Sequence, residues 1–369
     1  KAPELVSDQV PAREWIGQHG CHHHGQRGAN QRPRKRDQDG MLEGRSRENL
    51  LVAVKREHTR PEVDAAANRI GLWATNRYEW VLMQYAAARA GVVLVGINPA
   101  CNIQELVHVL KHSEASMLIM SHGAGNIDFD AASVRDQLPH LKKVYTIEND
   151  WSIFLECGQS VSNEQLTDIE SNIEPDDPVM ILHTSDTAGT PKYVTLTHRN
   201  VLNSGFFIGE HLHLGNTDRV AIPVPLYHPF GAIWAGMAAV THGSCIVLTG
   251  EHFDAANVMQ AVQDERCTTL IGTPLMYIGE MNLPGFDGYS LASLRNCVIA
   301  GSQCPESVID SMLTKMTLSE VNTLFGSIES SAMCVRTIVC NDVRCRSANS
   351  TILPHIEVKI IDAETGETA

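Results

Sequence analysis

The residues best suited to phosphate chemistry lie in one short loop after the apolar run at residues 179–182. From Thr184 to Lys192 the loop reads Thr-Ser-Asp-Thr-Ala-Gly-Thr-Pro-Lys. Hydroxyls, backbone N–H groups and an ammonium are the groups that bind a polyphosphate. The spacing differs from the G-x-x-x-x-G-K-[ST] pattern of a Walker A loop. Taken alone, the loop is equally compatible with phosphate binding and with an ordinary polar turn between two strands.

Small polar turns follow three apolar runs later in the chain. Each is a glycine followed by a hydroxyl residue: Gly272-Thr273, Gly301-Ser302 and Gly326-Ser327. In open α/β sheets ligands bind beyond the carboxyl ends of the strands, where small residues let a ligand approach the backbone. Glu329 follows the last of these turns and is a natural acidic partner for a Mg²⁺ ion that bridges phosphates. Any one of these turns, taken alone, is more often a plain strand-to-helix connection.

His228 lies in the segment Pro-Leu-Tyr-His-Pro at residues 225–229, after a predicted strand at 219–223. A histidine at this position could line a pocket or steer a carboxylate, although a lone histidine in an aromatic turn is more often a packing residue. The apolar, small-residue run at 231–239 predicts a helix packed tightly on a sheet, or one wall of an acyl tunnel. The chain has no H-E-x-x-H zinc motif and no G-x-S-x-G nucleophile motif.

The elements that must position these residues alternate between strand and helix. In the first half we predict strands at 70–74, 92–95, 117–120 and 143–146, with helices at 77–90, 103–112 and 134–141. Asn76 and Asn102 each precede a glutamate by three residues, which predicts two capping boxes. In the second half we predict strands at 193–196, 219–223, 245–248, 268–271, 297–300, 321–325 and 356–361, with helices at 197–203, 230–241, 255–264 and 305–316. This alternation predicts an α/β fold with mostly parallel sheets.

The 369-residue chain divides into three predicted segments. Residues 1–60 lack periodic apolar residues, and we expect them to be irregular or disordered, with the Cys-His-His-His tract at 21–24 exposed rather than metal-bound. Residues 61–178 predict a first α/β subdomain and a linker, and residues 179–369 predict a second α/β subdomain. Net charge is −14, which disfavours a nucleic-acid binder. Ten cysteines without a C-x-x-C pair predict reduced thiols in an intracellular compartment, and no apolar run is long enough for a membrane span.

Four segments together resemble the motifs of the AMP-forming acyl-CoA synthetases, a family of the ANL adenylating superfamily. The loop at 184–192 resembles the phosphate-binding signature T-S-G-T-T-G-x-P-K-G, and Pro225-Leu226-Tyr227-His228 resembles the second family motif. Ala300-Gly301-Ser302 resembles the turn of the adenine pocket, and the segment from Phe325 to Glu329 resembles Y-G-T-T-E. The resemblance extends from about residue 70 to residue 362. It is strongest to the medium-chain, mitochondrial branch called acyl-CoA synthetase family member 2.

The resemblance implies an ANL-type N-terminal domain of two stacked, mostly parallel αβ subdomains, without the small C-terminal domain. It implies that a medium-chain fatty acid attacks the α-phosphate of ATP, which gives an acyl-adenylate and pyrophosphate. The thiol of coenzyme A then displaces AMP. The implied cofactors are ATP and Mg²⁺, with coenzyme A as co-substrate, and the implied location is the mitochondrial matrix. Oligomeric state and acyl chain length stay open.

The same resemblance assigns roles by position. The phosphates would be held by Thr184, Ser185, Thr187, Gly189 and Lys192. The adenine would be bordered by Gly301, Ser302 and Gly326, with Phe325 stacked on it. Ser327 would contact the α-phosphate or the carboxylate, Glu329 would hold Mg²⁺, and His228 would lie at the acyl pocket. The catalytic set would be Thr184, Lys192, His228 and Glu329.

Four positions depart from the family motifs. Asp186 replaces a glycine and brings a negative charge beside the phosphates, while Ala188 replaces a hydroxyl donor. Tyr193 replaces the closing glycine, and Ile328 replaces a hydroxyl residue beside Glu329. Residues 65–70 run directly into the first predicted strand, without the helical turn and the glycine-aspartate step that the family usually has there. This loss predicts that part of the first α/β layer is left uncovered. These departures support an alternative function, a catalytically impaired pseudoenzyme or binding protein on the same fold.

Overall fold

The computed structural model describes residues 68–122, 134, 136–184, 192–318, 320–331, 333–340, 350–362, 365, 367 and 368. The predicted irregular segment at 1–60, including the Cys-His-His-His tract, lies outside the described residues. The same holds for residues 185–191 of the predicted phosphate loop, among them Ser185, Thr187 and Gly189.

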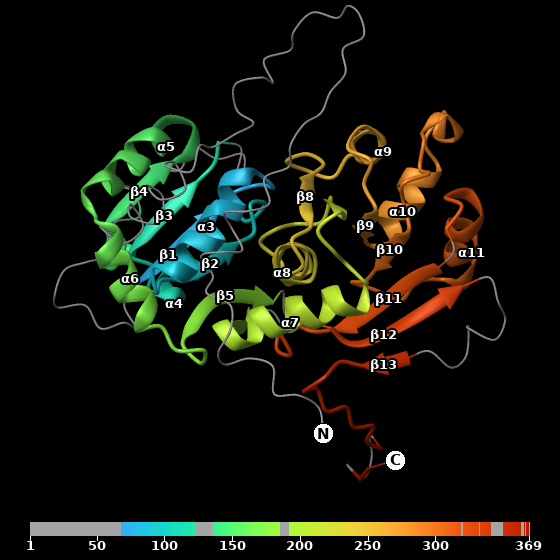
Figure 1. Cartoon of the computed structure of the whole chain (residues 1–369). Helices are drawn as coiled ribbons and strands as arrows, with labels where there is room; N and C mark the ends of the chain where they lie inside the picture. Colours follow the sequence, from blue (N-terminus) through green and yellow to red (C-terminus); the bar gives the residue numbers. More distant parts are fainter. Residues whose placement is uncertain are drawn as a thin grey trace, which may run out of the picture.

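The first of two sheets has the strand order β4-β3-β1-β2-β5-β6. Figure 1 labels the first five of these strands. Its strands are β1 (Arg69–Trp73), β2 (Val93–Ile97), β3 (Met117–Met120), β4 (Lys143–Thr146), β5 (Pro178–Thr184) and β6 (Lys192–Thr197). All neighbours pair in parallel except β5 and β6, which form an antiparallel hairpin. Because β5 and β6 belong to this sheet, the chain passes to the second sheet after residue 197, and not at the predicted boundary between residues 178 and 179.

The second sheet has the order β13-β12-β11-β10-β9-β7-β8. Its strands are β7 (Arg219–Ile222), β8 (Cys245–Leu248), β9 (Thr269–Gly272), β10 (Asn296–Ile299), β11 (Glu320–Gly326), β12 (Met333–Cys340) and β13 (Ser350–Ile352). β7 to β11 pair in parallel, and β12 and β13 add an antiparallel edge. The predicted strand at 356–361 is wrong, because among the described residues no strand forms in this segment and Ile361 makes an isolated bridge to Thr368.

Helices cover both sheets. They are α3 (Tyr78–Arg89), α4 (Ile103–Ser113), α5 (Ile147–Glu156), α6 (Asn163–Ser171), α7 (His198–His211), α8 (Ala238–Thr241), α9 (Ala255–Asp264), α10 (Pro274–Met281) and α11 (Glu306–Lys315), together with a π-helix, η5 (Phe230–Met237). The predicted linker at 151–178 instead contains most of α5 and all of α6, because Phe154 and Leu166 bury their side chains in the core. Of the helix predicted at 134–141, the structure describes 3₁₀-helical residues at 134, 136 and 137 and a turn at 139 and 140, but no α-helix among these described residues.

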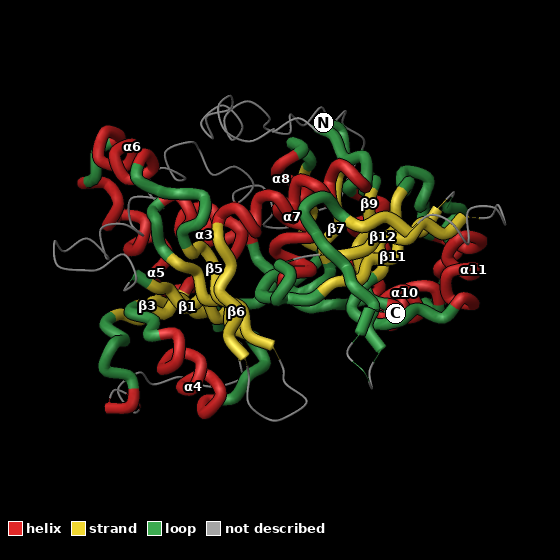
Figure 2. Tube along the Cα trace, turned by 90° about the horizontal axis from the view of Figure 1, so that it is seen from below, coloured by secondary structure: helices red, strands yellow, loops and turns green. Residues whose placement is uncertain are grey.

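The two sheets share one core. Buried side chains of β1, α3, α7, β7 and η5 belong to a single apolar cluster. A second cluster lies under α9, α10 and α11, and a third lies under α4. The layers are therefore α4, the first sheet, the central helices, the second sheet and the outer helices, and Figure 2 shows α3 and α4 on opposite sides of the first sheet. Within the described ranges, no helix combines the length and apolar character that a membrane span requires.

One of the two predicted capping boxes is confirmed. The Asn102 side chain accepts a hydrogen bond from the Glu105 N–H, and the Glu105 carboxylate accepts one from the Asn102 N–H. The capping box predicted at Asn76 is wrong. Helix α3 begins after Arg77, no side chain caps it, and the Asn76 carboxamide bonds to the second half of the chain instead.

Candidate active site

Three predicted site turns lie side by side at the carboxyl ends of neighbouring strands. Ile299 of β10 pairs with Gly272 of β9 on one side and with Thr323 of β11 on the other. A Cβ atom on Gly301 would lie 3.4 Å from the Cγ2 atom of Thr273, so the turns after β9 and β10 touch. The parallel register thus brings residues separated by more than fifty positions to one edge of the second sheet.

The edge between Gly301 and Phe325 suits a planar aromatic ligand. Gly301 has a φ of +91°, in the left-handed region that favours glycine. Ser302, the next residue, is exposed. The Phe325 side chain, at the end of β11, is 71% exposed although it is large and apolar. An uncovered ring beside an open backbone turn offers a surface on which a purine can stack.

Glu329 is carried on a turn that side-chain contacts hold in place. The Ser330 N–H donates to the Ser327 hydroxyl, and the Ser327 N–H donates to the Ser330 hydroxyl. On the far side of Glu329, the buried Ser331 has a φ of +58°, and its hydroxyl lies 3.2 Å from the Ser204 hydroxyl of α7. The Ile328 side chain is buried in the shared core, whereas Glu329 is exposed. Ile328, noted above as a departure from the family motif, therefore anchors the turn.

The Glu329 carboxylate has the chemistry that suits Mg²⁺. Among the described residues, no group of three or more histidines, cysteines and carboxylates could hold an ion. Mg²⁺ is usually bound through one or two carboxylates and completes its shell with waters and substrate phosphates. A single exposed carboxylate on a held turn, as at Glu329, matches that requirement.

Thr184 and Lys192 face each other at the two ends of the predicted phosphate loop. They are paired residues of the β5–β6 hairpin, with Thr184 half-buried and Lys192 exposed. Tyr193, next to Lys192, stacks on His112 of α4 with ring centroids 5.5 Å apart, and burial raises the pKa of Tyr193 to about 12. The tyrosine that replaces the family glycine thus fixes the start of β6 on α4.

His228 is a neutral histidine at the junction of the two sheets. The Phe230 N–H donates to Nδ1 of His228 over 3.2 Å, so the neutral ring carries its proton on Nε2. Burial, reinforced by the neighbouring His183, lowers the pKa of His228 to about 4. His183 immediately precedes Thr184 in β5. His228 therefore lies near the base of the phosphate hairpin, and its Nε2–H can donate to a carboxylate or phosphate oxygen.

Sequence reasoning missed two residues that shape this site. Asn76 binds the backbone of the loop that leads to His228, and Ser331 binds α7 beside the Glu329 turn. The spacing between Asn76 and Glu79 drew attention to Asn76, but it predicted a helix cap. For Ser331 no sequence pattern distinguished it from the other serines of the segment.

Gly231 allows the His228 loop to close on itself. A Cβ atom at Gly231 would lie 2.2 Å from the Pro225 carbonyl oxygen, which is backbone and cannot swing aside. We expect Gly231→Ala to lower the free energy of unfolding by about 1–3 kcal/mol, because the loop and η5 must separate. Thermal and urea unfolding measure this loss. Gly279→Ala is the matched control, because the nearest atom to its Cβ would be 3.9 Å away. An equal loss in both variants would show that the close approach at Gly231 is unimportant.

The chain is similar to known proteins over most of its length. The model of the family described as AMP-binding enzyme matches residues 65–369. The chain is similar to the zebrafish (Danio rerio) protein named medium-chain acyl-CoA ligase ACSF2, mitochondrial, with 31% identity over 81% of this chain and 54% of that protein. It is also similar to the putative acyl-CoA synthetase YngI of Bacillus subtilis, with 32% identity over 81% of this chain and 58% of that protein. The chain thus spans somewhat more than half the length of these relatives.

Solved structures show the same fold. The anthranilate CoA ligase AuaEII, solved in complex with anthranoyl-AMP, superposes with a TM-score of 0.76 at 21% identity, over 88% of this chain and 60% of that chain. The N-terminal domain of FACL13 from Mycobacterium tuberculosis superposes with a TM-score of 0.74 at 19% identity, over 88% of this chain and 77% of that chain. The two αβ layers predicted from the motif resemblance, an ANL-type N-terminal domain, are therefore confirmed.

Proposed function

Because this chain belongs to the AMP-binding enzyme family, we propose that it activates a carboxylic acid with ATP and passes the acyl group to coenzyme A. The observation that carries the proposal is the exposed ring of Phe325 beside the left-handed turn at Gly301, on the sheet edge that also bears Glu329. A stacking surface, an open backbone and a carboxylate for Mg²⁺ at one edge are what binding of a purine nucleotide requires.

The chain's own residues would act by positioning and by charge. Lys192, with the hydroxyls of Thr184, Ser185 and Thr187, would hold the β- and γ-phosphates, and Gly189 would let its backbone approach them. Glu329 would hold Mg²⁺, which when bound neutralises phosphate charge as pyrophosphate leaves. Attack of the carboxylate on the α-phosphate needs in-line placement of the two groups.

The remaining groups would define the adenylate. Phe325 would stack on the adenine, and Gly301, Ser302 and Gly326 would border it. Ser327 would contact the α-phosphate or the carboxylate. His228, which is neutral above about pH 4, would donate its Nε2–H to the carboxylate without acting as a base, since its other nitrogen accepts the Phe230 N–H.

The substrate we propose is a medium-chain fatty acid, and the location we propose is the mitochondrial matrix. Both rest on the similarity to proteins named medium-chain acyl-CoA ligase ACSF2, mitochondrial. An ATP–pyrophosphate exchange assay with fatty acids of graded length tests the substrate class. We expect exchange that depends on the fatty acid and is greatest at medium length. Exchange that is indifferent to the acid, or greatest with a short aromatic acid, would exclude this substrate.

The second candidate function is nucleotide binding without catalysis. Tyr193 favours it, because the ring stacked on α4 fills the place where the family motif has a flexible glycine. Saturable MgATP binding without pyrophosphate exchange would support this second function over the first.

Asp186 gives the sharpest test of the loop. We expect Asp186→Gly to strengthen MgATP binding by about tenfold, because it removes a negative charge beside the phosphates and restores close backbone approach. Isothermal titration calorimetry measures the change. The Asp186→Asn variant removes the charge but keeps the side chain, and it separates the two contributions. Unchanged or weaker binding in both variants would mean that this loop does not hold the phosphates.

A further inference from the structure

The side chain of Asn76, which follows β1, hydrogen-bonds to the loop that follows β7 in the other sheet. Its Nδ2 donates to the Val224 carbonyl over 2.8 Å, and its Oδ1 accepts the Leu226 N–H over 2.8 Å. Asn76 is 7% exposed, and Val224 and Leu226 are also buried. One carboxamide thus satisfies two buried peptide groups that lie about 150 positions further along the chain.

A second set of hydrogen bonds, to Glu251, lies at the same end of β1. The Thr75 hydroxyl donates to the Glu251 carboxylate over 2.8 Å, and the Asn76 N–H donates to the Glu251 carbonyl over 3.2 Å. Glu251 lies in the segment after β8. The Thr75 hydroxyl therefore links the first sheet to a segment of the second half other than the loop at 224–228.

Backbone hydrogen bonds connect the segment that Asn76 binds to His228. The Pro225 carbonyl, between the two peptide groups that Asn76 binds, accepts the His228 N–H over 3.2 Å. The His228 carbonyl accepts the N–H groups of Gly231 and Ala232 at the start of η5, over 3.0 Å each. Loss of the Asn76 carboxamide would take its two hydrogen bonds from the buried Val224 carbonyl and Leu226 N–H, which favours a shift of the loop that solvates them.

We propose that Asn76 is a positioning residue for His228. It fixes the 224–226 backbone so that Nδ1 of His228 meets the Phe230 N–H and the ring presents a single tautomer, protonated on Nε2, to the acyl side of the site. The acyl-side role rests on the proposed function, whereas the tautomer rests on the contacts alone. The second sheet thus supplies the histidine, and the first sheet supplies the residue that orients it.

Nitrogen-15 NMR of the full chain, labelled on the histidine rings, tests this directly. The His228 signals are assigned by their loss in His228→Gln. In the wild type we expect the Nε2-protonated tautomer and no titration above about pH 5, since the His228 pKa is about 4. In Asn76→Ala and Asn76→Asp we expect a mixture of tautomers and a titration midpoint raised by about one pH unit or more, because the loop opens to water.

Thr75→Val is the matched control. It removes one inter-sheet hydrogen bond of the same length, so it lowers the melting temperature, but it leaves the His228 signals unchanged. Asn76→Ser keeps part of the polar contact and serves if Asn76→Ala does not fold. Folded Asn76 variants with wild-type His228 signals would overturn the proposal, as would an equal change in Thr75→Val.

A kinetic readout connects the residue to the reaction. In pyrophosphate exchange, we expect Asn76→Asp to raise the KM for the carboxylic acid about tenfold while the KM for ATP stays within about twofold. A larger rise in the KM for ATP would contradict the assignment to the acyl side. If the wild type shows no exchange, the proposed function fails, but the NMR result still decides whether Asn76 orients His228.

Discussion

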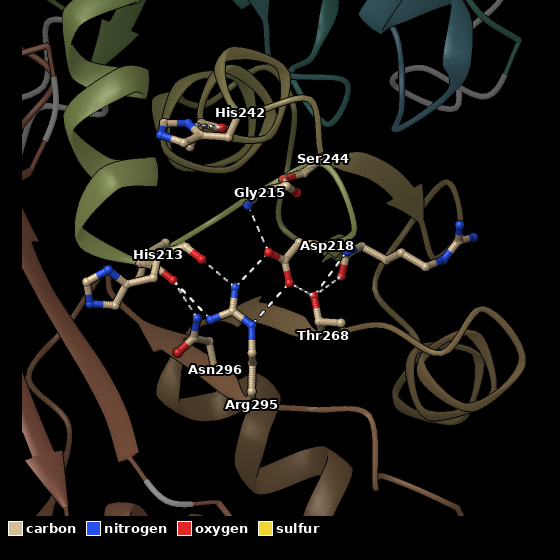
Figure 3. A network of polar contacts seen from close by, with 11 residues as sticks. His213, Gly215, Asp218, His242, Ser244, Thr268, Arg295 and Asn296 are labelled. Atoms are coloured by element: carbon tan, nitrogen blue, oxygen red, sulfur yellow. Dashed lines mark hydrogen bonds and ion pairs between the residues drawn. The ribbon is translucent and has the colours of Figure 1, made fainter. Parts of the chain in front are cut away.

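Arg295→Met is expected to lower the free energy of unfolding by roughly 2–4 kcal/mol, because it leaves the buried Asp218 carboxylate without its cation. The Arg295 guanidinium donates to Asp218 Oδ2 over 2.7 Å and to Oδ1 over 3.1 Å, and the Asp218 side chain is 8% exposed. The Thr268 hydroxyl and the Gly215 N–H also donate to this carboxylate (Figure 3). Because these donors remain, the expected loss of stability is smaller than for a buried carboxylate with no hydrogen bonds.

The same guanidinium closes the carboxyl end of α7. It donates to the His213 carbonyl over 2.7 Å and to the Leu212 carbonyl over 3.3 Å, and the Asn296 side chain donates to Leu212 as well (Figure 3). A cation at this end also interacts favourably with the helix dipole. Because α7 continues from the β5–β6 hairpin, Arg295 secures the helix that links the phosphate hairpin to the second sheet.

Urea unfolding of Arg295→Met and of Arg199→Met tests this account. Arg199 pairs with Asp176 on the surface, where the two side chains are 49% and 73% exposed, so its loss should cost far less stability than the loss of Arg295. Burial opposes ionisation of Asp218, but hydrogen bonds from Arg295 and Thr268 hold its pKa below the ordinary value. This stabilisation is present above the ordinary pKa and is lost as pH falls through the lowered one, so the Arg295→Met deficit should shrink in acid. Equal losses for the two arginines at neutral pH would contradict the account.

Glu280→Met is expected to stabilise the protein by roughly 3–5 kcal/mol at pH 8. Glu280 on α10 is 0% exposed, and neither carboxylate oxygen has a hydrogen-bond partner within the described part of the chain. Burial raises the pKa of this carboxyl from its ordinary 4.5 to about 8. The folded protein therefore holds a proton that the unfolded chain releases.

The sign of the pH dependence follows from the raised pKa. The contribution of Glu280 to stability is fully present below about pH 4.5 and is lost as pH rises to about 8, by about 1.4 kcal/mol per pH unit. Urea unfolding of wild type, Glu280→Met and Glu280→Gln between pH 5 and pH 8 measures it. Both variants should flatten the decline, while only Glu280→Met also removes the unpartnered polar atoms. A wild-type curve parallel to both variants would mean that Glu280 does not titrate in this range.

Sequence reasoning identified the parallel strands because strands buried on both faces are continuous apolar runs. It also located Gly301, Phe325 and Glu329, which the structure brings to one edge of the second sheet. Alternation misled it at 356–361, where Val358 and Ile360 remain exposed and no described strand pairs with them. An alternating pattern is necessary for an edge strand, but a strand also needs a partner that local sequence does not specify.

Asn76 shows why long-range contacts escaped prediction. Its spacing to Glu79 satisfies the local rule for a capping box, yet the buried peptide groups of Val224 and Leu226 compete for the same carboxamide. A buried peptide group without a hydrogen bond costs more free energy than an uncapped helix end that is open to water. The Asn76 side chain therefore bonds to the distant loop and not to the end of α3. No local rule contains that competition. For the same reason, the sequence did not predict that β5 and β6 belong to the first sheet. The pairing of β5 with β2 depends on the whole fold and not on the sequence of the β5–β6 hairpin.

Calorimetric titration of the chain with MgATP, repeated with AMP in the absence of Mg²⁺, tests the central claim that the edge of the second sheet is a nucleotide site. The wild type should bind both ligands saturably at one site. Phe325→Ala should weaken both, because it removes the stacking surface, whereas Glu329→Gln should weaken only MgATP. Wild-type binding that neither variant changes would place the nucleotide elsewhere, and no binding of either ligand by the wild type would contradict the claim outright.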